Sequence, residues 1–189
     1  MTDTTDKAAP VMLASREIFK GRIFEVTTDT VREADKTYTR DVVRHVGGAG
    51  VVACFQDDTV ALVRQYRHPT GSYVLEIPAG KLEEGERPEV TAARELEEEL
   101  GVVAGRMEPL SDFYTTPGFC SERLWIFLAT ELTATAQRLE DDELIEVVRV
   151  PFKRALSMAW SGEIEDAKTI IGLMLAARLL KVGDAVMDD

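Results

Sequence analysis

The sequence has few cysteines, few histidines and no long apolar run. Its two cysteines, Cys54 and Cys120, are too few for a disulfide framework or a zinc site built from four thiolates. No stretch reaches the roughly 20 apolar residues that a membrane-spanning helix needs. Residues 1–14 contain one basic side chain, Lys7, and no sustained apolar segment of the kind that marks an export signal. We therefore expect a cytoplasmic protein without a membrane segment.

Positive charge is also scarce. Lysine and arginine number 22 against 34 aspartates and glutamates, which gives a formal net charge of -12. This balance argues against binding to a nucleic-acid backbone or to an anionic membrane, and it makes cations the likelier ligands. The two histidines, His45 and His68, have no partner at ligand spacing, so we interpret them as structural or surface groups.

The 189 residues, of which 45% are hydrophobic, suffice for one full core and a small additional lobe. We expect a flexible tail over residues 1–14, an N-terminal antiparallel β lobe over residues 15–47, a main domain over residues 48–182 and a second tail over residues 183–189. In the lobe, strands are expected at 17–32 and 37–45 around a polar turn at 33–36. The glycine-rich stretch 47–50 is the expected joint between lobe and main domain.

The main domain is predicted to be mixed α/β. Apolar runs bounded by turn residues predict strands at 51–55, 59–66, 73–77, 105–114, 123–130 and 144–150. Helices are expected at 88–100, 152–160 and 166–181, the last so apolar that most of its surface must be covered.

An unusually acidic segment begins just before the helix expected at 88–100 and continues through it. Eight glutamates fall within residues 83–99. Pro88 suits a first helical turn and Gly101 suits the position after the last one. At about 100° per residue, one face should carry the apolar side chains and the opposite face three carboxylates. The apolar set is Val90, Ala93, Leu96 and Leu100, and the carboxylates are Glu95, Glu98 and Glu99.

Three carboxylates at this spacing repel one another by a few tenths of a kcal/mol per pair. A hard divalent cation such as Mg²⁺ would remove that penalty, since it prefers carboxylate oxygens. The alternative is an ordinary solvated acidic face, because glutamate is a good helix former. Spacing alone does not decide between the two.

The complete pattern of the segment resembles the Nudix box of the Nudix hydrolase family. That box consists of Gly, five residues, Glu, seven residues, and then Arg-Glu-apolar-x-Glu-Glu-x-Gly-apolar. The matching positions are Gly80, Glu86, Arg94, Glu95, Leu96, Glu98, Glu99, Gly101 and Val102. The resemblance implies a Nudix-type α/β/α sandwich and hydrolysis of a nucleoside diphosphate linked to a further group.

The resemblance also implies roles for particular residues. Glu95, Glu98 and Glu99 would hold Mg²⁺, or alternatively Mn²⁺, with the backbone carbonyl of Ala79 as a further metal ligand. Arg94 would pair with Glu86 and orient the ligands. We count Glu98, Arg94 and Glu86 among the expected catalytic groups.

Other segments resemble the ADP-ribose pyrophosphatase group of this family. Pro117 lies sixteen residues after Gly101, in a Pro-Gly turn at the group's spacing. Residues 64–67, 77–80 and 166–170 also look like this group. The resemblance implies a homodimer in which the N-terminal lobe helps to hold the nucleoside base of the partner subunit.

Substrate contacts are expected from several further side chains. Arg67, and after it Arg64, are candidates for a phosphate or terminal-ribose contact, with a surface salt bridge as the alternative for each. Glu122 could reach the metals or the terminal ribose, or form a salt bridge at the strand edge. Ile23 and Arg40 occupy positions where group members stack on the base.

The general base is expected on the acidic loop at 139–144. Glu143, which immediately precedes an apolar strand, is the preferred residue, whereas Glu140 and Asp141 could equally belong to a solvated loop.

These observations predict a homodimeric, Mg²⁺-dependent enzyme that cleaves ADP-ribose to AMP and ribose 5-phosphate. One alternative is a pyrophosphatase for another nucleoside diphosphate sugar, such as GDP-mannose. A second is a sensor that binds ADP-ribose without turnover, although a sensor has no need for an intact set of metal carboxylates.

Overall fold

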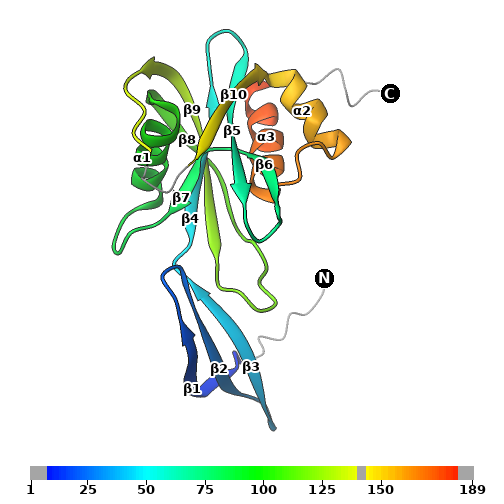
Figure 1. Ribbon diagram of the computed structural model, residues 1–189. Coiled ribbons are helices and arrows are strands. Elements are labelled where there is room, and N and C mark those ends of the chain that lie inside the picture. Colours follow the sequence, from blue (N-terminus) through cyan, green and yellow to red (C-terminus); the bar gives the residue numbers. More distant parts are fainter. Residues whose placement is uncertain (1–7, 140–143, 183–189) are drawn as a thin grey trace, which may run out of the picture. The chain divides into compact units, whose positions relative to one another are not determined.

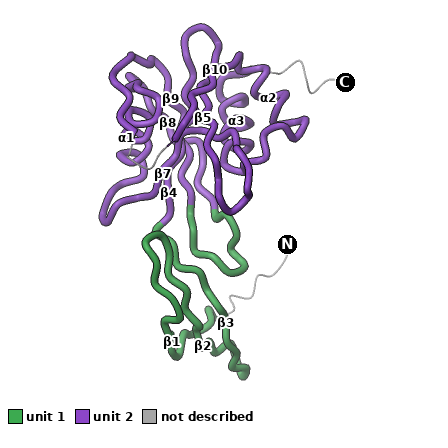
Figure 2. Tube along the Cα trace, in the orientation of Figure 1, with its two compact units in different colours: residues 1–46, 114–123 green, residues 47–113, 124–189 purple. Residues whose placement is uncertain are grey.

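The computed structural model describes residues 8–139 and 144–182, and it divides the chain into two compact units (Figure 2). The first unit comprises Met1–Val46 together with Tyr114–Arg123. The second comprises Gly47–Phe113 and Leu124–Asp189. No helix among the described residues is long and apolar enough to cross a membrane.

The first unit is a three-stranded antiparallel sheet rather than a two-stranded hairpin. Its strands are β1 (Val11–Lys20), β2 (Phe24–Glu33) and β3 (Lys36–His45), in that spatial order. The strand expected at 17–32 is interrupted because the chain reverses at Gly21, whose N-H donates to the carbonyl of Phe24 at 3.0 Å. β1 therefore begins inside the segment expected to be a tail.

The second segment of this unit, Tyr114–Arg123, is tied to β3 through the backbone. Val43 N-H donates to the carbonyl of Phe119 at 2.8 Å, and Ser121 N-H donates to the carbonyl of Val43 at 2.9 Å. These bonds place the Pro-Gly turn at residues 117–118 in the same unit as the N-terminal sheet.

The second unit is built on a mixed sheet. Its strands are β4 (Gly48–Cys54), β5 (Thr59–Arg67), β6 (Ser72–Glu76), β7 (Ala79–Lys81), β8 (Val102–Tyr114), β9 (Arg123–Ala134) and β10 (Ile145–Pro151). The main path runs β10-β5-β4-β9-β8, with β6 paired to β5 and β7 paired to β4. The pairing of β4 with β9 is parallel, whereas β4 with β5 and β5 with β10 are antiparallel.

Helices cover both faces of this sheet, as expected for an α/β/α sandwich (Figure 1). The helix α1 (Pro88–Leu100) lies on one face, and α2 (Phe152–Ser161) and α3 (Ala167–Leu180) lie on the other. β4 is buried along its whole length because alternate side chains enter the two cores. Val52 packs with the α2 and α3 side chains, whereas Val51 packs with α1.

The ends of α1 coincide with those predicted from the sequence. Pro88 occupies the first turn, and Gly101 ends the helix in the left-handed conformation with φ 62°, its N-H donating to the carbonyl of Glu97 at 2.9 Å. The short strand β7 was not predicted, because three residues carry too little pattern to be recognised.

Candidate active site

The inward face of α1 carries charge. Its buried residues are Thr91, Ala92, Glu95, Leu96 and Glu99. Val90 is 44% exposed and Ala93 is exposed as well, so the face predicted to be apolar is rotated relative to the one that packs. Of the apolar set named from the sequence only Leu96 is buried, and it shares the inward face with Glu95 and Glu99, which were expected on the opposite face.

Arg94 binds the surrounding carboxylates. Its Nη1 donates to Glu95 Oε1 at 2.7 Å and to Glu98 Oε2 at 3.0 Å, and its Nε donates to Glu86 Oε1 at 3.4 Å. Burial alone would lower the pKa of Arg94, but the hydrogen bonds to Glu86 and Glu98 and the charge of Glu95 outweigh it and raise that pKa. The predicted pairing of Arg94 with Glu86 is thus present, and the same guanidinium also bridges two of the expected metal ligands.

Glu86 is held on the loop before α1 by more than Arg94. Its Oε2 accepts hydrogen bonds from Thr91 Oγ1 at 2.8 Å and from the backbone N-H of Glu83 at 3.1 Å. Burial would raise the pKa of Glu86, but the hydrogen bonds from Arg94, Glu83 and Thr91 prevail and lower it. The loop carboxylate therefore stays ionised and can orient Arg94.

The strand β7 touches the helix α1 at Gly80. A Cβ atom built on Gly80 would lie 1.7 Å from Glu95 Oε1, and one built on Gly48 would lie 2.7 Å from the carbonyl oxygen of Gly80. Side chains at these positions would displace the Glu95 carboxylate or the strand β7. The backbone of β7 at Gly80 consequently lies directly against the inward carboxylate of Glu95.

The donor set at this place suits a hard divalent cation. Glu95 and Glu99 are 7% and 4% exposed, and Glu98 is partly exposed on the next edge of the helix. Carboxylate and carbonyl oxygens are the ligands that Mg²⁺ and Mn²⁺ prefer. Within residues 8–139 and 144–182 no three His, Cys, Asp or Glu side chains are grouped closely enough to hold one ion, and the carboxylates of Glu95 and Glu98 are turned towards Arg94.

The C-terminal end of α1 is capped by the chain that follows β9. Gln137 Nε2 donates to the carbonyl of Glu99 at 2.6 Å, and the Arg138 N-H donates to the carbonyl of Glu98 at 3.0 Å. These bonds satisfy carbonyls that a helix end leaves without intrahelical partners. The chain then enters residues 140–143, so the expected base Glu143 and its alternatives Glu140 and Asp141 lie outside the described residues.

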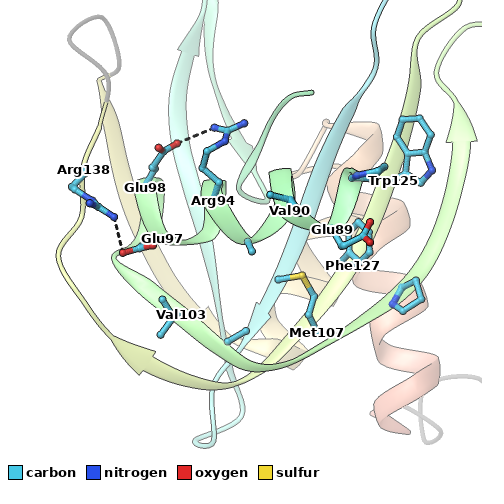
Figure 3. A pocket seen from close by; sticks show the side chains of 14 residues that line it. Glu89, Val90, Arg94, Glu97, Glu98, Val103, Met107, Trp125, Phe127 and Arg138 are labelled. Carbon is cyan, nitrogen blue, oxygen red and sulfur yellow. Dashed lines mark hydrogen bonds and ion pairs between the residues drawn. The ribbon is translucent and has the colours of Figure 1, made fainter. Parts of the chain in front are cut away.

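A cavity of about 970 Å³ opens on the other side of α1, between that helix and strands β8 and β9 (Figure 3). Its walls are mainly apolar and include Val90, Met107 and Phe127. Arg94 and Glu98 line it as well, so the guanidinium that binds the inward carboxylates also borders this cavity.

The two candidate arginines ahead of the box differ in their surroundings. Arg67, at the end of β5, forms a two-bond ion pair with Glu76, in which Nε–Oε1 is 2.6 Å and Nη2–Oε2 is 2.8 Å. Arg64 is exposed, lies 3.4 Å from Glu146 and stacks over the ring of Tyr73. Arg67 is therefore fixed, whereas Arg64 has the surface salt bridge that was its alternative interpretation.

The remaining predicted substrate residues belong to the first unit. Arg40 and Pro117 line a cavity of about 410 Å³ between β3 and the Pro-Gly turn, and Arg40 also stacks on Tyr38 with 4.2 Å to the ring centroid. Glu122 accepts a hydrogen bond from Thr115 at 2.8 Å and lies 3.5 Å from His45 Nδ1. Ile23 is 60% exposed and is absent from that cavity's lining.

Sequence reasoning missed the buried carboxylate at the end of β6. Glu76 is 2% exposed and receives bonds from both Arg67 and Lys168. Burial would raise the pKa of Glu76, but the hydrogen bonds and charges of these two cations lower it instead. The one local indication of this buried carboxylate was the glutamate itself, which interrupts the otherwise apolar stretch 73–77.

The chain is similar to several known proteins. A protein of Bacillus subtilis named ADP-ribose pyrophosphatase is 40% identical over 160 residues, which cover 83% of this chain and 86% of that protein. A GDP-mannose pyrophosphatase of Salmonella arizonae is 35% identical, with 77% of this chain and 82% of that protein covered. A solved structure titled as an ADP compounds hydrolase matches the fold with a TM-score of 0.79 over 91% of this chain and 94% of that chain, at 24% identity.

The model of the NUDIX domain matches residues 44–171, a range that contains the whole of β4 to α2 and the carboxylates of α1. Because this match spans more than half of the sequence, the chain belongs to the NUDIX domain family.

Proposed function

We propose that this protein hydrolyses ADP-ribose to AMP and ribose 5-phosphate with Mg²⁺ or Mn²⁺ as cofactor. The observation that carries the proposal is the contact between Gly80 and Glu95, which brings the backbone of β7 against an inward carboxylate of α1. The names of the relatives support the substrate class, since both act on nucleoside diphosphate sugars.

In this proposal the carboxylates of Glu95, Glu98 and Glu99 and the carbonyl of Ala79 hold the ion or ions. A bound divalent ion neutralises phosphate oxygens and lowers the pKa of an attacking water. Arg94 keeps the carboxylates oriented, because it is itself fixed by Glu86. Arg67 presents its guanidinium to the diphosphate, and Arg64 is the secondary candidate.

Glu143 is proposed to accept the proton of the attacking water. One P-O bond forms to that water, and the bridging P-O bond breaks to leave two monophosphates. Support for Glu143 comes from its place in the sequence, directly before an apolar strand. Further support comes from Gln137 and Arg138, which cap α1 and so hold the chain just ahead of the acidic stretch 139–144 against the helix that carries the proposed metal ligands. Arg40, Pro117 and Glu122, with Ile23, are proposed to contact the nucleoside or the terminal ribose.

The free thiols fit the proposed cytoplasmic location. Cys54 and Cys120 form no disulfide, and burial raises the pKa of Cys54 to about 12. A thiol of that kind stays protonated at neutral pH and is inert.

The function is tested by an assay of AMP release with Mg²⁺ across nucleotide sugars, dinucleotides and nucleoside triphosphates. We expect ADP-ribose to have the highest kcat/KM. GDP-mannose far ahead of ADP-ribose would replace the substrate, and ADP-ribose binding without any turnover would identify a sensor. Turnover of none of these compounds would reject the hydrolase.

A second prediction separates metal binding from proton transfer. Glu99→Gln should lower kcat by at least about 100-fold and weaken Mn²⁺ binding, because a neutral amide is a poor ligand for a hard cation. Glu143→Gln should lower kcat while Mn²⁺ binding, followed by electron paramagnetic resonance, is kept. Glu97→Gln on the same helix is the control, and an active Glu99→Gln enzyme would contradict the ligand assignment.

A third prediction concerns the contact at Gly80. Gly80→Ala should push the Glu95 carboxylate aside, so that Mn²⁺ affinity falls and kcat drops by about 100-fold, the size of effect that a misplacement of about 1 Å produces. The matched control is Gly105→Ala on β8, whose Cβ would also meet a glutamate, Glu131, at 2.9 Å. Equal effects of the two substitutions on Mn²⁺ affinity would show that the Gly80 contact is not specific to the site.

The fourth prediction is the oligomeric state. All ten residues of β1 are exposed, and this edge strand carries large apolar side chains such as Val11, Leu13 and Phe19, each close to half exposed. An exposed apolar edge strand favours pairing with another chain. We propose a homodimer with a shared active site, so sedimentation velocity at micromolar concentration should show a dimer, and a monomer would exclude the shared site.

A further inference from the structure

Two cations bind one buried carboxylate at the junction of β5, β6 and α3. Arg67 engages both oxygens of Glu76, at 2.6 and 2.8 Å, and the Lys168 ammonium donates to the second of these oxygens. Lys168 also donates to Asp166 at 3.0 Å. The cluster contains two cations and two carboxylates and is neutral, which allows Glu76 and Lys168 to be buried together.

The first turn of α3 is fixed in the place from which Lys168 reaches Glu76. Asp166 caps the helix by accepting from the Thr169 N-H at 2.9 Å and from the Thr169 hydroxyl at 2.6 Å. That hydroxyl in turn accepts from the Ile77 N-H at 2.7 Å. Ile77, which follows Glu76, and Thr169, which follows Lys168, are thus hydrogen-bonded to each other.

Arg67 has donors to spare. A guanidinium carries five N-H groups in a rigid plane, and Glu76 uses one on Nε and one on Nη2. The Arg67 side chain is 41% exposed, in contrast to the 3% exposure of the Glu76 side chain. One edge of the plane is therefore held by protein, and the other is available to an anion in a fixed orientation.

Arg67, Glu76, Lys168 and Asp166 lie close enough to α1 for the charge of Glu99 to act on Arg67. The pKa of Arg67 is raised chiefly by its hydrogen bond to Glu76, and the charges of Glu99 and Asp166 act in the same direction. If Lys168 were absent, the negative charges of Glu76, Asp166 and Glu99 would compete for the single guanidinium. Lys168 offsets Asp166 and satisfies Glu76, which leaves Arg67 with one defined partner.

We propose that Lys168 is a positioning residue: it fixes the Glu76 carboxylate, and Glu76 in turn fixes the Arg67 guanidinium for the diphosphate of the substrate. Lys168 acts through Arg67 and does not itself touch the substrate. The role of Lys168 in substrate binding rests on the proposed function. The orientation of Arg67 by Glu76 and Lys168, called the Arg67 clamp below, is a property of the protein without substrate.

The kinetic test is a double-mutant cycle with ADP-ribose and Mg²⁺. Lys168→Met should raise KM by about tenfold, with a smaller change in kcat, because an anion-binding group loses its orientation. In an Arg67→Gln background the same substitution should change kcat/KM by less than about twofold, since residues that act as a unit are not additive. Effects that multiply in the double variant would overturn the proposal.

Three further variants test whether the effect of Lys168→Met comes from the lost charge and hydrogen-bond donors of Lys168. Lys168→Arg keeps the charge and the donors and should restore most of the lost kcat/KM, whereas Lys168→Gln gives a second measurement if Lys168→Met fails to fold. Lys153→Met removes an exposed lysine of α2 and should leave all parameters unchanged. Failure of Lys168→Arg to exceed Lys168→Met would also contradict the proposal.

A readout without substrate separates the clamp from the activity. In ¹⁵N-labelled protein the Arg67 Nε-H resonance, assigned with Arg67→Gln, should shift or broaden in Lys168→Met and stay in place in Lys153→Met. An unchanged resonance would overturn the clamp whatever the enzyme hydrolyses. If the wild-type protein does not hydrolyse ADP-ribose, the proposed function fails, and the resonance still decides the role of Lys168.

Discussion

The burial of negative charge under α1 is the constraint on which the rest of the second unit depends. A helix that turns Glu95 and Glu99 towards a sheet loses the hydration of two carboxylates, and the effective cost is several kcal/mol per ion unless cations compensate. Arg94 supplies one positive charge from the same helix. Small residues supply the space, since Ala49, Ala53 and Ala129 line the core between α1 and the sheet and Gly80 lies directly against Glu95.

The same constraint explains why the loop before α1 is so closely bonded. Glu86 has to hold Arg94 from outside the helix, and it can do so only because Thr91 and the Glu83 N-H hold Glu86 in turn. The pairing of β7 with β4 brings the backbone of Gly80 into line with Ala49. The short strand β7 thus fixes the backbone that lies against Glu95, and the bonds of Glu86 and Arg94 fix the Glu95 carboxylate from the other side.

Much of the fold could be predicted from the sequence because its signals are local. Pro88 and Gly101 mark the ends of α1, and the apolar runs of β4, β5 and β9 are long enough to stand out. The inward face of α1 could not be predicted from apolar periodicity, because two of the residues that face the sheet are glutamates. The reversal at Gly21 was missed because residues 17–32 contain few turn residues.

The candidate site likewise has a part that a local motif indicates and a part that depends on residues far apart in the sequence. The box motif indicates the carboxylates, Arg94 and Glu86, all within a short segment. The partners of Glu76 could not be recognised, because Lys168 is 92 positions away and nothing in the local pattern of either residue indicates the other. The roles of all the predicted site residues, from the metal ligands on α1 to the substrate contacts and Glu143, stay predictions.

The bonds between β6 and α3 also set an order of events during synthesis. The ribosome releases the chain from its N-terminus, so the whole Nudix box and every strand of the sheet emerge before Lys168 and Thr169. Until α3 has been made, the chain contains only one of the two cations that bind Glu76, and it lacks the threonine hydroxyl to which the Ile77 N-H donates. The last helix therefore completes the contacts that hold the end of β6, the segment that leads into β7.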